Sequence, residues 1–289
     1  MKDNAPIQIH PQKWRETCDP FSFPFQRFQL GEVLGYPHAG NDVFYVRGEY
    51  DGREVLAYLK AARRKDAALK REAEVLSQLD GDIYPRVLEA DWEQGTFLLT
   101  QALPGQRLSV IAGENEDLRS LSYMEAYGEA LGRLHALTVK TGKQQDRKFY
   151  HTPSQALLEK LGLKDLEPFF ARKPEGGKQV FCHGDCHYAN MLWEDHALSA
   201  VLDFELSGYG DRDFDIAWAM FLRPGQKFFK TEKETEAFLN GYKRQGDCSC
   251  EAVRYYMAQC YVYFLEACGE DEAYAAWIRQ WLRTNCERG

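Results

Sequence analysis

Alternating apolar and polar positions run through the N-terminal third of the chain and are interrupted by short turn-forming segments. This pattern predicts strands over residues 28–33, 43–50, 54–60, 87–92 and 96–100. Asp51-Gly52, between the second and third strands, is a strong signal for a two-residue hairpin. Neighbouring strands joined by such turns pair antiparallel, so the first strands are expected to form an antiparallel meander.

A helix is predicted over residues 67–79, after the third strand. Its apolar residues recur at helical spacing and form one face: Leu69, Ala73, Leu76 and Leu79. On a helical wheel of about 3.6 residues per turn, Glu72 falls within that face and Glu74 lies nearly opposite. Glu72 is therefore expected to point inward.

The chain changes character at Pro104-Gly105, where a hinge is expected over residues 101–105. Beyond it, helices are predicted over residues 123–137, over 216–222 and within 251–285, and short apolar runs lie between 179 and 204. These patterns predict an α+β protein with two domains. Residues 1–101 would form a small antiparallel-sheet lobe, and residues 102–289 a larger, mainly helical lobe.

Composition narrows the class of protein. No apolar run approaches the roughly 20 residues that a membrane span needs, and the N-terminus lacks the apolar stretch of a secretion signal. We therefore expect a cytoplasmic protein with no membrane partner and with its eight cysteines reduced. The net charge of −8 argues against a nucleic-acid partner and would suit a cationic small molecule.

The candidate chemistry lies in two short motifs. The first is His183-Gly184-Asp185-Cys186-His187-Tyr188-Ala189-Asn190, and the second is Asp203-Phe204-Glu205, which follows an apolar run. Phosphoryl transfer needs a carboxylate beside the acceptor hydroxyl and oxygen ligands for magnesium. Asp185, Asn190 and Asp203 provide that set of side chains.

These motifs resemble the aminoglycoside phosphotransferase and choline kinase-like family, whose pattern is His-Gly-Asp, four residues and then Asn, followed by an Asp-rich second strand. The resemblance covers almost the whole chain. It implies a bilobal protein-kinase-like fold in which Asp185 is the catalytic base and Asn190 and Asp203 bind Mg²⁺. It also implies that Lys60 orients the nucleotide phosphates and that Glu72 holds Lys60.

The N-terminal lobe would then bind the nucleotide, ATP or GTP. The loop expected over the phosphates lacks the Gly-x-Gly-x-x-Gly of protein kinases, so backbone amides over residues 39–42, including Gly40 and Asn41, are expected to approach a phosphate. The nucleotide base is expected at the hinge, against the main chain around Gln101 and Leu103.

The C-terminal lobe would bind the acceptor, a small molecule with a hydroxyl group. By the same resemblance, His183 and His187 shape the catalytic loop and Asp215 is a buried acceptor of hydrogen bonds beneath it. The sequence does not determine the oligomeric state or the identity of the acceptor. The candidate acceptors are an aminoglycoside, choline, ethanolamine, homoserine or another alcohol.

The same residues allow three other interpretations. A nucleotide-binding pseudokinase is disfavoured because all five polar positions of the site are present. A zinc site built from Cys182, His183, Cys186 and His187 is disfavoured because neighbouring residues of a strand point to opposite faces. Tyr255, Tyr256, Tyr261 and Tyr263 could form an aromatic box for a cation, but their helical spacing favours core positions.

Overall fold

The computed structural model describes residues 17–37, 40–175, 177–268 and 271–286. These residues form two compact units. The first contains the described residues up to Gly105 together with Val139–Thr141 and Ser199–Leu206, and the second contains Gln106–Thr138, Gly142–Leu198 and the described residues from Ser207 onward. The predicted domain boundary at residue 101 stays a prediction.

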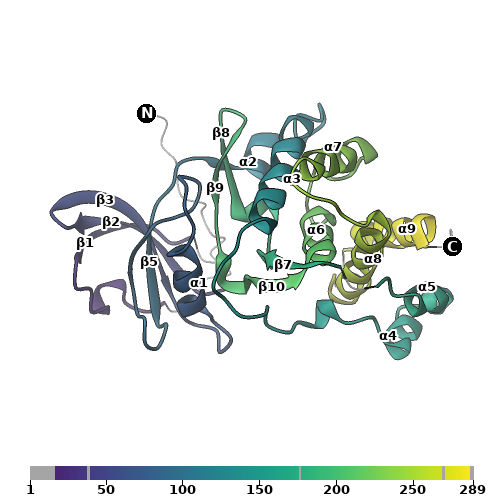
Figure 1. The fold of residues 1–289 in the computed structure, drawn as a ribbon, viewed down its shortest axis with the longest axis horizontal. Helices are drawn as coiled ribbons and strands as arrows, with labels where there is room; N and C mark the ends of the chain where they lie inside the picture. Colours follow the sequence, from purple (N-terminus) through teal and green to yellow (C-terminus); the bar gives the residue numbers. More distant parts are fainter. Residues whose placement is uncertain (1–16, 38–39, 176, 269–270, 287–289) are drawn as a thin grey trace. The chain divides into compact units, whose positions relative to one another are not determined.

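The first unit is built on a five-stranded sheet. Its strands lie in the order β1 (Phe28–Gly35), β2 (Asp42–Tyr50), β3 (Arg53–Ala61), β5 (Phe97–Gln101) and β4 (Val87–Ala90). Every neighbouring pair is antiparallel, which confirms the predicted meander (Figure 1). A short 3₁₀ turn, η2 (Pro20–Ser22), precedes the sheet.

The hairpin between β2 and β3 turns at Asp51-Gly52, as predicted. Both residues have positive φ angles, 50° and 77°, which suit a two-residue turn between twisted strands. The core of the sheet is apolar, and its buried side chains include Phe28, Phe44, Leu59, Phe97 and Leu99. Their burial fixes the register, because a shift by one residue would turn the apolar set to the other face.

Helix α1 (Leu69–Leu76) belongs to the first unit and is shorter than the predicted range 67–79. Its regular turns end at Ser77, where the chain enters a turn. Glu72 is only 2% exposed, whereas Glu74 is exposed to solvent. The inward orientation predicted for Glu72 is therefore confirmed.

The second unit contains two small sheets. β7 (Gln179–Cys182) pairs antiparallel with β10 (Gly208–Asp211). The other sheet has the order β6 (Gln106–Arg107), β8 (Met191–Glu194) and β9 (Ala197–Val201), and the residues of β9 from Ser199 onward are assigned to the first unit. The motif that begins at His183 follows β7 directly, so a strand end sets its starting position.

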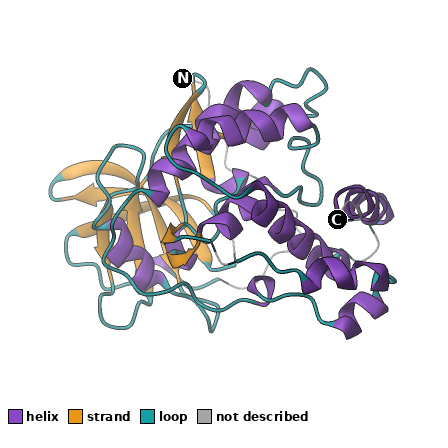
Figure 2. Cartoon of the chain, turned by 45° about the vertical axis from the view of Figure 1, so that its right-hand side comes forward, coloured by secondary structure: helices purple, strands orange, loops and turns teal. Residues whose placement is uncertain are grey.

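Helices make up most of the second unit (Figure 2). In chain order they are α2 (Leu108–Ala112), α3 (Leu121–His135), α4 (Gln155–Lys160), α5 (Glu167–Ala171), α6 (Arg212–Met220), α7 (Glu232–Lys243), α8 (Cys250–Ala267) and α9 (Glu272–Cys286). Short 3₁₀ turns are η3 (Lys148–Tyr150), η4 (Lys164–Leu166) and η5 (Tyr188–Asn190), with η6 (Phe204–Leu206) in the first unit. Within the described residues, no helix combines the length and the apolarity needed to cross a membrane.

Helix α6 begins at Arg212, earlier than the predicted start at residue 216. Its N-cap is Asp211, whose carboxylate accepts hydrogen bonds from the backbone N–H groups of Asp213 and Phe214. Apolar periodicity alone does not reveal the polar first turn of this helix, so the sequence pattern predicts too late a start. The earlier start brings Asp215 into the helix.

Helices α3 and α7 pack against each other without room for side chains at two glycines (Figure 1). A Cβ atom on Gly128 would lie 1.9 Å from the carbonyl oxygen of Phe238, and one on Gly241 would lie 1.9 Å from that of Glu125. Thr231 and Glu234 start α7 with a capping box. At the end of α3, Nδ1 of His135 lies 2.8 Å from the hydroxyl oxygen of Tyr242 on α7.

The aromatic residues of α8 are core residues, as the sequence favoured. Tyr255, Tyr256, Tyr261 and Tyr263 are all at least nine-tenths buried. The eight cysteines, all within the described residues, form no disulfide, in agreement with the prediction of reduced thiols.

Candidate active site

In the first unit, Lys60 and Glu72 form an ion pair that Asp203 joins. Lys60 lies near the end of β3, and its Nζ atom is 2.8 and 2.9 Å from the two carboxylate oxygens of Glu72 on α1. The same Nζ atom is 3.0 Å from Oδ1 of Asp203. The structure therefore brings three of the predicted site residues into direct contact.

Burial and the neighbouring charges shift the pKa values of both Lys60 and Glu72. Burial would lower the pKa of Lys60, but the carboxylates of Asp203 and Glu72 raise it above its ordinary value, so the amine stays protonated. Burial raises the pKa of Glu72 to about 7, against the opposing charge of Lys60. Glu72 thus titrates near neutral pH, where its ordinary counterpart would be fully ionised.

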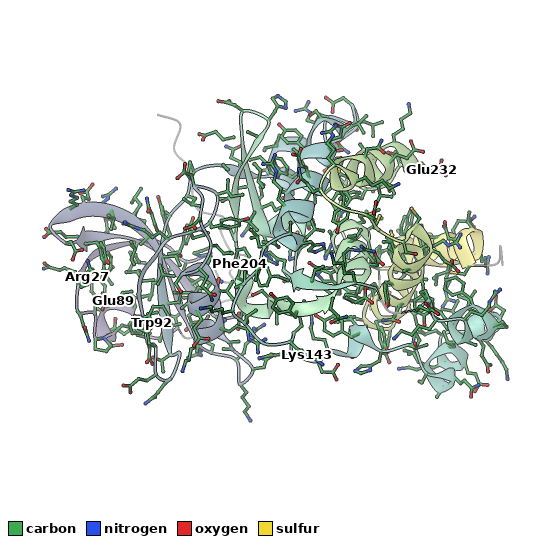
Figure 3. All side chains as sticks on the ribbon, viewed as in Figure 1. Arg27, Glu89, Trp92, Lys143, Phe204 and Glu232 are labelled. Atoms are coloured by element: carbon green, nitrogen blue, oxygen red, sulfur yellow. The ribbon has the colours of Figure 1, made fainter. Side chains whose placement is uncertain are left out.

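Of the two carboxylates that contact Lys60, that of Asp203 is the one that remains open to a ligand. Its side chain is 30% exposed, against 3% for Glu72. Its φ angle of 66° lies in the left-handed region, which Asp tolerates better than most residues. Phe204, labelled in Figure 3, follows it and donates its backbone N–H to Oε1 of Glu72 at 3.3 Å.

The donor set around Asp203 is chemically suited to magnesium. Glu72, Asp203 and Glu205 each place one carboxylate oxygen within 4.8 Å of the other two. Hard oxygen ligands of this kind are those that Mg²⁺ prefers. Glu72 and Glu205 are buried beside Lys60 and Arg64, whereas the side chain of Asp203 is 30% exposed, so Asp203 is the most accessible member of the three.

Glu205, where protein kinases have glycine, is a buried junction within the first unit. One carboxylate oxygen accepts hydrogen bonds from Arg64 Nη2 and from the backbone N–H of Ala68, both at 2.8 Å. The other accepts a hydrogen bond from Asn41 Nδ2 at 3.0 Å. Glu205 therefore connects the loop before β2 with the start of α1.

The predicted phosphate loop is described only in part. Ala39 lies outside the described residues. Gly40 has a φ angle of 88°, a conformation that glycine adopts without strain. Asn41 is 3% exposed, and its side chain is bound to Glu205 and to the backbone N–H of Arg63. A phosphate at this loop would therefore meet backbone amides rather than the Asn41 side chain.

The main chain of the predicted hinge is only partly hydrogen-bonded. The backbone N–H groups of Gln101 and Ala102 donate to the carbonyl oxygens of Arg86 and Leu56, both at 2.9 Å. Among the described residues, no hydrogen bond is formed by the N–H of Leu103. Leu103 thus offers the main-chain donor that the nucleotide base was predicted to use.

In the second unit, Asp185 is held by neutral donors. Its Oδ1 atom accepts a hydrogen bond from the indole N–H of Trp218 at 2.8 Å. Nδ2 of Asn190 donates to the backbone carbonyl oxygen of Asp185 at 3.0 Å. This contact fixes the turn between the two motif residues and leaves the amide oxygen of Asn190 for another partner.

The two motif histidines shape the loop, as expected. His183 Nδ1 accepts the backbone N–H of Asp185 at 3.3 Å, and His187 Nδ1 accepts that of Ala189 at 3.2 Å. His187 Nε2 also lies 3.5 Å from Oδ2 of Asp185. Both imidazoles therefore act on the backbone within two residues of themselves.

The carboxylate of Asp185 stays ionised. Burial raises its pKa, but His187, followed by Arg223 and Arg147, lowers it more, so the net pKa lies below its ordinary value. A carboxylate of this kind orients a hydroxyl group well and holds a proton weakly.

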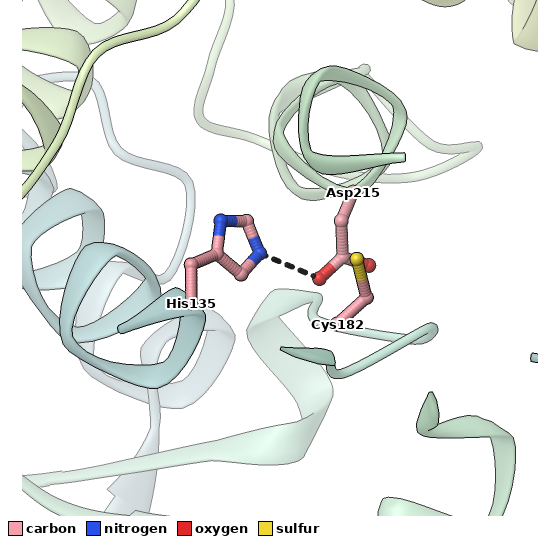
Figure 4. A group of neighbouring side chains, drawn as sticks. All are labelled: His135, Cys182 and Asp215. Carbon is pink, nitrogen blue, oxygen red and sulfur yellow. Dashed lines mark hydrogen bonds and ion pairs between the residues drawn. The ribbon is translucent and has the colours of Figure 1, made fainter. Parts of the chain in front are cut away.

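A buried network lies beneath the catalytic loop (Figure 4). Asp215 accepts the backbone N–H groups of His183 and Gly184, both at 2.9 Å, which confirms its expected structural role. His135 Nε2 lies 3.1 Å from Asp215, and Cys182 is close enough for the three side chains to resemble a metal site. Hydrogen bonds already account for the histidine and the carboxylate, so we interpret the group as structural.

Sequence reasoning missed four side chains that complete these two sets of residues. They are Arg64, Arg147, Trp218 and Arg223. Trp218 could have been found, because it lies one helical turn after Asp215 in the segment that resembles the family. The arginines have no comparable signal in the sequence, since their positions depend on tertiary packing.

Comparisons with known proteins cover most of the chain. A model of the phosphotransferase enzyme family matches residues 34–253. Aminoglycoside 3'-phosphotransferase of Niallia circulans is 27% identical over 246 residues, which are 78% of this chain and 88% of that protein. Stress response kinase A of Escherichia coli strain K12 is 26% identical over 204 residues, which are 60% of this chain and 58% of the kinase.

Solved structures show the same fold. A thermostable mutant of aminoglycoside phosphotransferase APH(4)-Ia, in complex with ADP and hygromycin B, aligns with a TM-score of 0.58 at 14% identity, covering 91% of this chain and 94% of that one. Macrolide 2'-phosphotransferase MphH from Brachybacterium faecium gives 0.51 at 21% identity over 87% and 92%. Ethanolamine kinase of Plasmodium vivax gives 0.56 at 11% identity over 90% and 82%. The predicted α+β protein-kinase-like fold is confirmed.

Proposed function

The chain belongs to the phosphotransferase enzyme family, and from that membership we propose that it moves the γ-phosphoryl group of ATP or GTP, with Mg²⁺, to a hydroxyl group of a small molecule. Aminoglycosides and amino alcohols are the acceptors named for its relatives and neighbours. The observation that carries the proposal is the contact of Lys60 with both Glu72 and Asp203.

Each site residue of the first unit has one task in this proposal. Lys60 neutralises the α and β phosphates, and Glu72 keeps its amine in place. Gly40 and Asn41 offer backbone amides to the phosphates, while the main chain of Gln101 and Leu103 receives the nucleotide base. A fixed ammonium group lowers the free energy of the transition state because it need not reorganise as charge moves to the leaving oxygen.

The magnesium ligands are proposed as Asp203 and Asn190. Asp203 supplies a negative oxygen, and Asn190 supplies its amide oxygen, since its nitrogen is already bound to the backbone of Asp185. When bound, the ion would screen the phosphates and stabilise the charge that develops during transfer.

Asp185 is proposed to align the acceptor. Its carboxylate accepts the hydrogen bond of the acceptor hydroxyl and so directs the oxygen lone pair toward phosphorus. As the new O–P bond forms, the bond between the γ-phosphorus and the bridging oxygen breaks and releases the nucleoside diphosphate, while the hydroxyl proton passes to the carboxylate and then to solvent. Trp218 holds the carboxylate in one rotamer, so the hydroxyl oxygen meets a fixed partner.

A binding experiment followed by turnover tests this proposal. The melting temperature would be measured with ATP or GTP, each with and without MgCl₂. Stabilisation that requires both nucleotide and Mg²⁺ is expected. Release of ADP or GDP would then be measured with a panel of amino alcohols, aminoglycosides and hydroxy acids, and at least one acceptor should raise it well above hydrolysis.

One result would contradict the proposed phosphotransferase function. If neither nucleotide shifts the melting temperature with Mg²⁺, and no acceptor raises nucleoside diphosphate release, the chain does not use this site for phosphoryl transfer. The exposed ion pair of Arg47 and Glu32 on the same sheet gives a control variant, Glu32→Gln, which should behave as the wild type in both measurements.

A further inference from the structure

The ring of Trp218, next to Asp185, already lies close to two cationic side chains of the chain itself. Arg147 and Arg223 place their guanidinium carbons 4.6 and 5.2 Å from the centre of the Trp218 ring. Trp218 is the residue whose indole N–H binds Asp185. Two guanidinium groups therefore lie within one side chain of the proposed base, all in the second unit.

A third cation lies over neighbouring aromatic rings. Lys148 Nζ is 5.3 Å from the centre of the Phe149 ring and 5.7 Å from that of Tyr263. Rings of this kind would attract a cationic acceptor if their faces were open. Here the chain's own Arg and Lys groups occupy positions over them, which weakens the case for a cationic ligand.

These cations have no carboxylate partner in the described part of the chain. No Asp or Glu oxygen there lies within 4.0 Å of the charged nitrogens of Arg147, Lys148 or Arg223. Arg147 donates to the carbonyl oxygen of Gly184 at 2.9 Å, and Arg223 donates to that of Trp218 at 2.8 Å. Carbonyl groups satisfy the N–H donors, and the single carboxylate of Asp185, which acts on both guanidinium groups from beyond salt-bridge distance, balances only one of their two positive charges.

The charge of Arg223 carries a desolvation cost. Burial lowers its pKa, and the charge of Asp185 only partly offsets that effect. A bound anion would restore the lost solvation and would pair with the guanidinium group. Guanidinium groups are especially suited to carboxylates and phosphates, because their planar N–H donors can bind two oxygens at once.

We infer that the acceptor carries an anionic group, a carboxylate or a phosphate, which Arg147 and Arg223 bind while its hydroxyl group meets Asp185. This inference rests on the proposed phosphotransferase function. The net charge of −8 does not oppose it, because net charge acts at long range and these cations act locally.

Matched acceptors test the charge requirement. Glycerate and glycerol 3-phosphate would each be compared with glycerol, and homoserine with the amino alcohol in which its carboxylate is reduced. Ethanolamine and an aminoglycoside would form the cationic arm. At least one anionic acceptor should show a kcat/KM about tenfold or more above its uncharged counterpart, as expected when a charged hydrogen-bond partner is lost. The carboxylate and phosphate arms identify which anion is used.

Variants test the residues. Arg147→Gln should reduce the preference for the anionic acceptor over its neutral counterpart by about tenfold, and Arg147→Lys should restore part of it. Because Arg147 also binds Gly184, a purely structural role would lower kcat with every acceptor equally and leave this ratio unchanged. Lys164→Gln removes the same charge from an exposed pair with Glu159 and should have no effect.

The outcomes separate the two ideas. If no anionic acceptor is phosphorylated, or if Arg147→Gln keeps the full preference, the inference is overturned. If ethanolamine or the aminoglycoside is then phosphorylated, the proposed function stands without it. If no acceptor is used and no nucleotide binds with Mg²⁺, both fail together.

Discussion

Two carboxylates of this protein are held in opposite ways. Asp203 contacts the ammonium group of Lys60 directly, in a cluster with Glu72. Asp185 instead accepts a hydrogen bond from the neutral indole of Trp218, and the guanidinium groups of Arg147 and Arg223 lie over that ring. The difference matches two tasks: an ion-paired carboxylate suits a site that collects phosphate and metal charges, whereas a carboxylate held by a neutral donor stays available to a hydroxyl group.

The largest effect on kcat should come from a change at Asp203, the ion-paired carboxylate. Asp203→Asn keeps the shape of the side chain but removes its charge, so the metal charge is unmatched during transfer. We expect kcat to fall by about a thousandfold or more, measured as nucleoside diphosphate release at saturating Mg²⁺. Activity within about tenfold of wild type would show that Asp203 does not bind the catalytic metal.

Loss of the neutral donor that binds Asp185 should lower kcat less strongly. Trp218→Phe removes the hydrogen bond to Asp185 and keeps an aromatic ring for the guanidinium groups. Since a hydrogen bond to a charged group contributes about 1.5–3 kcal/mol, kcat should fall about ten- to hundredfold while the KM for ATP stays unchanged. A variant that lost nucleotide affinity instead would contradict the separation of the two sets of residues. Circular dichroism would check that the fold is kept.

The junction at Glu205 should affect the nucleotide and not the chemical step. Glu205→Gln weakens the contacts to Arg64, Ala68 and Asn41 that hold the loop before β2. We expect the KM for ATP to rise about tenfold and kcat to change little. Equal loss in kcat and in kcat/KM would mean that Glu205 acts in the transition state.

The smallest effect concerns pH. Because the pKa of Glu72 is raised to about 7, its carboxylate is ionised above that pH and takes up a proton as the pH falls through it. The KM for ATP should therefore rise a few-fold between about pH 8 and pH 6. Glu72→Gln should remove this dependence. Dividing the pH profile of the wild-type KM by that of the variant cancels the titration of the nucleotide itself.

The same pKa has a consequence for stability. A carboxyl group whose pKa is raised on folding binds its proton more tightly in the folded protein. Its contribution to stability is full below the ordinary value of 4.5 and is lost as the pH rises through about 7. Wild type and Glu72→Gln should therefore differ most in the pH dependence of their melting temperatures between these two values.

Much of the first unit could be predicted from the sequence because its signals are local. Alternation gave the strands, Asp51-Gly52 the hairpin, and helical spacing the inward position of Glu72. The start of α6 was missed because it depends on the cap at Asp211. The positions of Arg147 and Arg223 could not be predicted, because a contact between a loop, a helix and a ring is set by tertiary packing.

The most direct test of the account compares Asp185→Asn with Asp203→Asn in nucleotide binding and turnover. Calorimetric titration with ATP, with and without Mg²⁺, would be paired with the release assay. Asp185→Asn should bind ATP and Mg²⁺ as the wild type does while turnover falls by about a hundredfold or more, and Asp203→Asn should lose the Mg²⁺ dependence of binding. Loss of nucleotide binding in Asp185→Asn, or Mg²⁺-dependent binding that persists in Asp203→Asn, would contradict the division of tasks between the two carboxylates.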